Sequence, residues 1–156
     1  MTTTAEGAGG PVEIREATLA DLLAVFRIER QSFPQPWPYA AFEFFVDEPG
    51  FLVAEAGEVV GYVVADIVPN HGRPIGHIKD FAVAPDHRGQ GIGARLLERA
   101  LVVLATNAVE TVKLEVRESN EAAQSLYRRY GFMPHHRIPR YYEDGEDALV
   151  FVKSDN

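Results

Sequence analysis

The sequence predicts an α+β fold in which about four helices flank a mixed sheet of about seven strands. Short apolar or alternating stretches of strand length recur along the whole chain. Between several of them lie longer segments whose apolar residues recur at helical spacing, and glycine or proline separates the two kinds of segment. The resulting order, β-α-α-β-β-β-α-β-α-β-β, indicates a mixed sheet with helices on its faces.

The first helix is expected to begin at a capping box. Thr18 and Asp21 have the spacing at which each side chain bonds the backbone N–H of the other residue. The helix is expected to end before Phe33–Pro38, because that segment holds three prolines. The apolar residues that recur at helical spacing are Leu19, Leu22, Leu23 and Phe26.

The remaining elements follow from the same patterns. Strands are expected at Val12–Ala17, Phe51–Ala56, Val59–Val68, His77–Ala84, Thr111–Arg117, Phe132–Ile138 and Asp147–Lys153, with a hairpin turn at Gly57-Glu58. Further helices are expected at Tyr39–Asp47, after Gly93, and from a cap at Ser119 or Asn120 to Gly131. The apolar stripe of the helix after Gly93 is Leu96, Leu97, Ala100, Leu101 and Leu104.

Composition excludes several classes of protein. The chain of 156 residues has no cysteine, which excludes disulfides, thiolate metal sites and a cysteine nucleophile. Its net charge of −8 disfavours nonspecific nucleic-acid binding, and no apolar run is long enough to span a membrane. Residues 1–10 are expected to be a disordered lead-in rather than a secretory signal, and residues 11–156 a single domain. We therefore expect a cytoplasmic protein.

The most informative segment is Arg88–Gly93, which lies between a predicted strand and a predicted helix. Its glycines permit positive φ, and the N-terminus of the following helix favours an anion such as pyrophosphate. A plain glycine-rich turn is the alternative. A Walker A loop is excluded because Ala94 follows Gly93. The dinucleotide fingerprint fits formally at Gly89, Gly91 and Ala94, but about 80 residues precede it, where a dinucleotide-binding domain has it in the first strand-helix turn.

Four segments together resemble the GNAT acetyltransferase superfamily. Arg88, Gly91 and Gly93 fit its phosphate signature Arg/Gln-x-x-Gly-x-Gly/Ala. Leu114–Phe132 resembles the second conserved block of the superfamily. Tyr141–Ala148 resembles the C-terminal block of the RimI-like and archaeal N-terminal acetyltransferases, and Arg30–Trp37 resembles their substrate-side loop. The resemblance implies the GNAT acyl-CoA N-acyltransferase fold, acetyl-CoA as co-substrate and transfer of an acetyl group to an amine.

The resemblance also implies roles for individual residues. The acetyl carbonyl and the pantetheine arm would be held by backbone N–H groups at Phe81, Ala82 and Val83. The pyrophosphate would be held by Arg88, Gly89, Gln90, Gly91, Ile92 and Gly93. Asn120 would bond the pantetheine, and Glu115 would accept the amine proton through water. Tyr127 would contact the CoA and protonate its sulfur, or alternatively it is a core residue that packs against Phe132.

His77 is a second candidate for proton transfer, because histidine titrates near neutral pH. A structural role for His77 is the alternative, and the choice between His77 and Glu115 as principal base stays open. His135 and His136 lie beside Arg137 and are expected in a solvated loop. No group of His, Asp or Glu residues has metal-ligand spacing, so no metal is expected.

The expected acceptor is the free α-amino group of a polypeptide, with a ribosomal protein as one candidate. An α-amine has a pKa of about 8 and lysine one of about 10.4, so more α-amine is neutral at pH 7. The residues expected to wall the acceptor site are Phe33, Pro34, Trp37, Tyr141 and Tyr142, although these aromatics also suit a cap over the sheet. Because cysteine is absent, we expect the amine to attack the thioester directly in a ternary complex. The enzyme is expected to be a monomer or a weak homodimer.

Other acceptors and other classes of protein are the alternatives. Asp80 stands where many N-terminal acetyltransferases have a small residue, which leaves a lysine side chain or a small-molecule amine as the alternative acceptor. A non-catalytic acyl-CoA sensor is disfavoured because Glu115, Tyr127 and His77 are all present. A structural interaction module has no need of the glycine-rich loop. No membrane partner and no direct nucleic-acid partner are expected.

Overall fold

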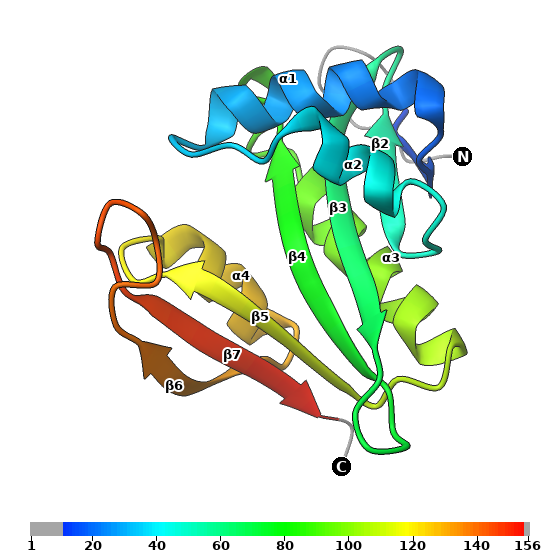
Figure 1. Ribbon diagram of the computed structural model, residues 1–156. Coiled ribbons are helices and arrows are strands. Elements are labelled where there is room, and N and C mark those ends of the chain that lie inside the picture. The colour runs from blue at the N-terminus through cyan, green and yellow to red at the C-terminus, as the bar shows by residue number, and fades with distance from the viewer. Residues whose placement is uncertain (1–10, 155–156) are drawn as a thin grey trace. The chain divides into compact units, whose positions relative to one another are not determined.

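The computed structural model describes residues 11–154, and within them it contains seven strands and four α-helices (Figure 1). The strands are β1 (Glu13–Glu16), β2 (Phe51–Glu55), β3 (Val59–Val68), β4 (Ile75–Val83), β5 (Thr111–Arg117), β6 (Met133–Ile138) and β7 (Ala148–Ser154). The helices are α1 (Leu22–Ser32), α2 (Tyr39–Phe45), α3 (Ile92–Thr106) and α4 (Glu121–Arg129). The predicted order of elements and the α+β fold class are confirmed. The lead-in expected at residues 1–10 lies outside the described residues.

Contacts between residues divide the chain into two compact units. In the described part, the first unit consists of residues 11–65 and 80–103, and the second consists of residues 66–79 and 104–154. The strands follow the order β1-β2-β3-β4-β5-β7-β6. Strands β3 and β4 and helix α3 contribute residues to both units.

In the first unit, α1 and α2 lie side by side and cover one face of β2 and β3 (Figure 1). The core between them consists of Leu22, Val25, Ile28, Phe42, Phe51, Val53, Tyr62 and Val64. The predicted capping box is confirmed, since the Thr18 N–H donates to Asp21 Oδ2 at 2.8 Å. The predicted apolar face of α1 is partly wrong, because Leu19 and Leu23 are 69% and 66% exposed. A 3-10 turn at Leu19–Asp21 precedes α1 and changes which residues face the core.

Helix α3 belongs mainly to the first unit and packs against β3 at Gly61. A Cβ added to Gly61 would lie 3.1 Å from Leu96 Cδ1 and 3.2 Å from the Ala82 carbonyl oxygen, so glycine permits this close approach. The buried residues of α3 are Ile92, Leu96, Leu97, Ala100 and Leu104, which confirms most of the predicted stripe. This packing fixes the start of α3, and with it the preceding glycine-rich loop.

The second unit is built on β5. Strand β4 pairs with β5 in parallel, and β7 pairs antiparallel with both β5 and β6. The predicted alternation of β5 is confirmed, because Val112, Leu114 and Val116 are buried, whereas Lys113, Glu115 and Arg117 belong to the opposite face. The strand expected at Phe132–Ile138 is confirmed as β6. His135 and His136 lie on this strand and are exposed, so the expectation that they lie in a loop is wrong and the expectation that they are solvated is confirmed.

Candidate active site

The loop Arg88–Gly93 has the backbone geometry of an anion site. Gly89 and Gly91 have φ values of 80° and 82°, a region that side-chain-bearing residues adopt at a cost. A Cβ added to either glycine would meet nothing within 4 Å, so the loop leaves room for a ligand. Helix α3 begins at Ile92, and the first N–H groups of an α-helix have no partner within the helix. These features fit a pyrophosphate group.

Arg88 connects this loop to two other elements of the first unit. Its Nε donates to the Val83 carbonyl oxygen at 2.9 Å, and one terminal nitrogen donates to Ser32 Oγ at 3.1 Å. Val83 ends β4 and Ser32 ends α1. The exposed guanidinium therefore holds the loop in place and supplies positive charge beside it.

Residues 81–83, which are Phe81, Ala82 and Val83, form the C-terminal end of β4, ahead of the loop. The beginning of α3 contacts them, because a Cβ on Gly93 would lie 3.5 Å from Phe81 Cζ and 3.6 Å from Val83 Cγ2. The Phe81 N–H donates to Asp80 Oδ1 at 3.0 Å. That N–H is thus engaged within the protein, and it must exchange this partner if it is to bind an acetyl carbonyl.

In the second unit, His77 and Glu115 form a close pair. His77 Nε2 lies 2.7 Å from Glu115 Oε1, and the two side chains are only 15% and 12% exposed. The register explains the contact: His77 pairs with Lys113 across the parallel strands, so Glu115 lies one pleat further on the same face. Lys113 Nζ lies 3.8 Å from Glu115 Oε2.

The Glu115 carboxyl is ionised at neutral pH. Burial raises its pKa, but the hydrogen bond and charge of His77 and the charges of Lys113 and Lys79 outweigh burial, so the net pKa is lower than usual. An ionised carboxylate only accepts hydrogen bonds, so the proton of this bond is on His77 Nε2. Nδ1 of His77 is then the ring nitrogen that can accept a proton.

Tyr127 and Asn120, both expected to contact CoA, have structural contacts in the second unit. Tyr127 is 7% exposed, and its ring lies 5.8 Å from that of Phe132 and 6.4 Å from that of Phe151. Asn120 caps α4, because its Oδ1 accepts the Ala123 N–H at 3.1 Å. The structure therefore gives Tyr127 the packing contact with Phe132 that the sequence offers as an alternative.

The expected acceptor residues of the first unit differ in burial. The Trp37 ring is partly buried and lies 5.3 Å from Phe42 and 5.8 Å from Phe45. Phe33 is also partly buried, whereas Pro34 is exposed. This segment thus has fixed ends and a solvent-facing middle.

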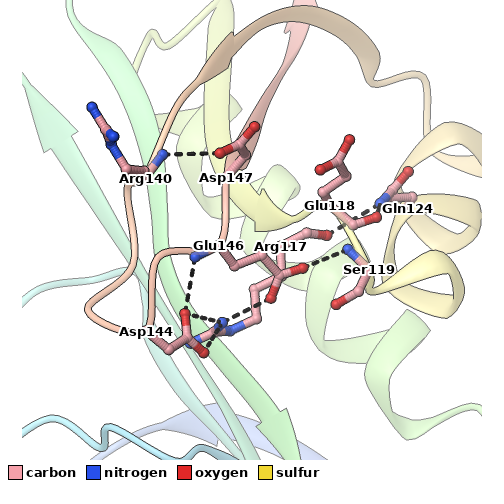
Figure 2. A network of polar contacts seen from close by, with 8 residues as sticks. All are labelled: Arg117, Glu118, Ser119, Gln124, Arg140, Asp144, Glu146 and Asp147. Atoms are coloured by element: carbon pink, nitrogen blue, oxygen red, sulfur yellow. Dashed lines mark hydrogen bonds and ion pairs between the residues drawn. The ribbon is translucent and has the colours of Figure 1, made fainter.

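Tyr141 and Tyr142 lie in a loop of the second unit that a network of ion pairs holds. Figure 2 shows Arg117, which lies 2.9 Å from Asp144 Oδ2 and 2.8 Å from Glu146 Oε1. The Arg117 guanidinium also lies over the Tyr142 ring, 4.1 Å from its centroid. Burial, reinforced by neighbouring groups, raises the pKa of Tyr142 to about 12.

The negative charge of Glu115 acts on Tyr141 of this loop. The pKa of Tyr141 is raised first by burial and then by the negative charge of Glu115, both within the second unit. The two tyrosine rings pack edge to face at 5.0 Å. The hydroxyl of Tyr141 therefore remains protonated and available as a donor.

The sequence reasoning missed a buried polar cluster in the first unit. Glu29 is 2% exposed and accepts a hydrogen bond from the Tyr62 hydroxyl, which also lies 3.5 Å from Asp80 Oδ2. The signal was present in the sequence, because Glu29 continues the buried stripe of α1 that contains Leu22 and Val25. An acidic residue on an apolar helical face is rare unless it has buried partners.

Comparisons with known proteins agree with this arrangement. A model of the acetyltransferase (GNAT) family matches residues 19–132. An N-alpha-acetyltransferase of Sulfolobus acidocaldarius is 40% identical over 153 residues, covering 90% of each chain. The crystal structure of Ard1 from Thermoplasma volcanium matches with a TM-score of 0.85 at 29% identity, covering 92% of this chain and 97% of that one. The ribosomal-protein-S18-alanine N-acetyltransferase from Escherichia coli matches with a TM-score of 0.81 at 30% identity, covering 92% and 93%.

The chain belongs to the GNAT family of acetyltransferases. It is accordingly an N-acetyltransferase whose co-substrate is acetyl-CoA, and the loop Arg88–Gly93 has the glycine geometry and helix start that such a donor requires. Among residues 11–154, no group of three or more His, Asp or Glu side chains is arranged to hold a metal ion. The helices in that range are too short or too polar to cross a membrane.

Proposed function

We propose that the enzyme transfers the acetyl group of acetyl-CoA to the N-terminal α-amine of a polypeptide. The observation that carries this proposal is the 2.7 Å contact between His77 and Glu115. A histidine-carboxylate pair is a weak base, which suits an amine with a pKa of about 8 better than a lysine with a pKa of about 10.4. The names of the Sulfolobus relative and of the Escherichia coli structure support the same acceptor class, and the latter supports a ribosomal protein as one candidate.

The proposed proton path assigns different roles to the two residues. The amine nitrogen attacks the acetyl carbonyl carbon directly, the C–N bond forms, and the C–S bond then breaks to release the CoA thiolate. His77 Nδ1 takes the proton that the amine loses, directly or through a water. Glu115 holds the Nε2–H and stabilises the positive ring, so His77 is the base and Glu115 its partner.

Tyr127 is the proposed proton donor to the thiolate, as the family resemblance implies. Its packing against Phe132 and Phe151 fixes the ring and offers a way to test the role. Replacement by Phe keeps this packing and removes only the hydroxyl. We expect turnover to fall about 100-fold with unchanged acetyl-CoA affinity. Full turnover in Tyr127→Phe would restrict this tyrosine to packing.

The resemblance assigns one segment of each unit to the acceptor, and the two segments are considered separately. Phe33, Pro34 and Trp37 are proposed to contact the first side chain of the acceptor, with the prolines limiting the entropy lost on binding. Tyr141 and Tyr142 are proposed to bond its backbone. Arg117 supports this role by holding the tyrosine loop through Asp144 and Glu146.

The test compares three acceptors by the release of free CoA. These are a peptide with a free N-terminus and an internal lysine, the same peptide with its N-terminus blocked, and a small polyamine. We expect CoA release with the free peptide alone. Equal rates with the blocked peptide, or a faster rate with the polyamine, would assign the acceptor to the alternative classes.

The proposal extends to the setting of the reaction. An enzyme that modifies the N-terminus of a ribosomal protein works in the cytoplasm, and direct transfer requires only a monomer or a weak homodimer. Sedimentation at enzyme concentrations used in activity measurements tests the second point. A stable higher oligomer would contradict it.

A further inference from the structure

Glu29 contacts both ends of the segment Phe33–Trp37. Its main-chain carbonyl oxygen accepts the Phe33 N–H at 3.1 Å, and its side-chain Oε2 accepts the Trp37 N–H at 2.8 Å. The other carboxylate oxygen, Oε1, accepts a short hydrogen bond from the Tyr62 hydroxyl. One residue at the end of α1 thus fixes where the segment leaves the helix and where it rejoins the core.

We propose that Glu29 is a positioning residue, which clamps the segment Phe33–Trp37 in the conformation that binds the first residue of the acceptor. This inference rests on the proposed function, since it assigns the same segment to the acceptor. It concerns residues of the first unit only.

The construction of the segment makes such a clamp effective. Phe33–Trp37 contains Pro34 and Pro36, whose rings restrict the backbone, and residues 34–36 are exposed. The Trp37 ring packs against Phe42 and Phe45, so its side chain is held as well as its N–H. With both ends fixed and two stiff residues between them, the segment has little freedom left to lose when a peptide binds.

The burial of Glu29 supports a positioning role. A buried carboxylate is strongly disfavoured unless its oxygens are hydrogen-bonded, and here Trp37 and Tyr62 each bond one of them. The Tyr62 ring is itself held edge to face against Phe42 at 5.7 Å. Tyr62 therefore fixes the carboxylate from the side opposite Trp37, and the helix cannot rotate it away without breaking both bonds.

Asp80 completes the cluster, because its Oδ2 lies 3.5 Å from the Tyr62 hydroxyl. Burial and the neighbouring Glu29 raise the pKa of Asp80 well above the usual value. The raised pKa favours the protonated form of Asp80 beside the Glu29 carboxyl group.

The test uses variants that separate the clamp from general stability. Glu29→Met removes the carboxylate but fills the same buried space, and it leaves the main-chain bond to Phe33 intact. Glu29→Gln keeps an oxygen that can accept the Trp37 N–H. Asp21→Asn is the matched control, because Asp21 is another buried carboxylate of this unit but bonds Arg15 and Thr18. If Glu29→Met does not fold, Tyr62→Phe replaces it, since it loses only one hydroxyl.

Two readings are taken for each variant. Trp37 is the only tryptophan of the chain, so its fluorescence and its quenching by acrylamide report on the segment independently of any reaction. The second reading separates the KM for a free-N-terminus peptide from kcat and from the KM for acetyl-CoA. In Glu29→Met we expect a red-shifted, more easily quenched Trp37 and a peptide KM raised about tenfold, the factor that loss of one buried hydrogen bond represents. The KM for acetyl-CoA and kcat should stay within about twofold.

The clamp predicts a different result for each variant. Glu29→Gln should return both readings toward the unmodified enzyme, Tyr62→Phe should move them partway, and Asp21→Asn should leave them unchanged. Unchanged Trp37 quenching and peptide KM in Glu29→Met, or in Tyr62→Phe if it takes its place, would overturn the proposal. If Trp37 responds but no peptide is a substrate, the clamp stands and the assignment of the acceptor fails.

Discussion

The proton transfer that we propose depends on the contact between His77 and Glu115. In this proposal His77 Nδ1 accepts the proton, because the Glu115 carboxylate accepts the hydrogen bond of Nε2. The carboxylate is shielded from water but surrounded by His77, Lys113 and Lys79, so it stays ionised. We therefore expect the negative charge of Glu115 to stabilise the imidazolium that the proposed proton transfer would form.

Removal of the charge on Glu115 tests this division of roles. In Glu115→Gln we expect turnover to fall about 100-fold, the scale of one proton-transfer group, because the positive ring loses its partner. The acid limb of the pH–rate profile should move to lower pH for the same reason. Glu110→Gln is the control, because Glu110 pairs with Arg73 on the exposed surface of the same unit. An unchanged rate and profile in Glu115→Gln would contradict the role of Glu115.

Asp80 should give the protein a characteristic dependence of stability on pH. Its pKa is raised in the folded state, so folding favours its protonated form, and this stabilisation is present at low pH and lost as pH rises through the folded-state pKa. Above the ordinary aspartate pKa of about 4, the unfolding free energy should therefore decline more steeply with pH than in Asp80→Asn, by up to about 1.4 kcal/mol per pH unit. Urea denaturation of both proteins across this range measures the difference. Parallel curves would show that Asp80 ionises normally.

Features of helices and strands that depend on neighbouring residues could be predicted from the sequence, whereas those that depend on packing between elements could not. The capping box at Thr18 and the alternation of β5 depend on neighbouring residues, so the sequence could predict both. The face of α1 depends on the 3-10 turn at Leu19–Asp21, which shifts the helical phase without a clear sequence signal. His77 and Glu115 could each be proposed from sequence, but their contact depends on the register of β4 against β5. The cluster at Glu29 depends on α1, β3 and β4 together and was missed.

The glycine-rich loop and the start of α3 together form the proposed pyrophosphate site. Substitution of Arg88 tests this role. Arg88→Ala removes a positive charge and the bonds to Val83 and Ser32. We expect acetyl-CoA binding to weaken by about 1.5–3 kcal/mol, as for loss of a charge-assisted hydrogen bond. Calorimetry measures the affinity, with Arg73→Ala as a control for loss of an exposed arginine. Equal affinities in Arg88→Ala and the unmodified enzyme would place the pyrophosphate elsewhere.

At the scale of the whole molecule, composition and fold restrict the reaction. The chain has no cysteine, so an acetyl group has no thiol on the protein to which it could be transferred, in line with direct attack on the thioester. The net charge of −8 favours cationic acceptors, and a protein N-terminus that is followed by basic residues meets that preference. The family model and the matching crystal structures establish the acetyltransferase class, while the acceptor is inferred from residues such as His77.

The position of the acetyl group on a product peptide shows whether the enzyme modifies the α-amine or a lysine side chain. One peptide that carries both a free N-terminus and an internal lysine is incubated with acetyl-CoA and enzyme, and tandem mass spectrometry locates the modification. His77→Ala serves as the control that separates enzymatic from spontaneous acetylation. We expect acetylation of the α-amine alone, and much less of it in His77→Ala. An acetyl group on the lysine side chain in the presence of the unmodified enzyme would contradict this expectation.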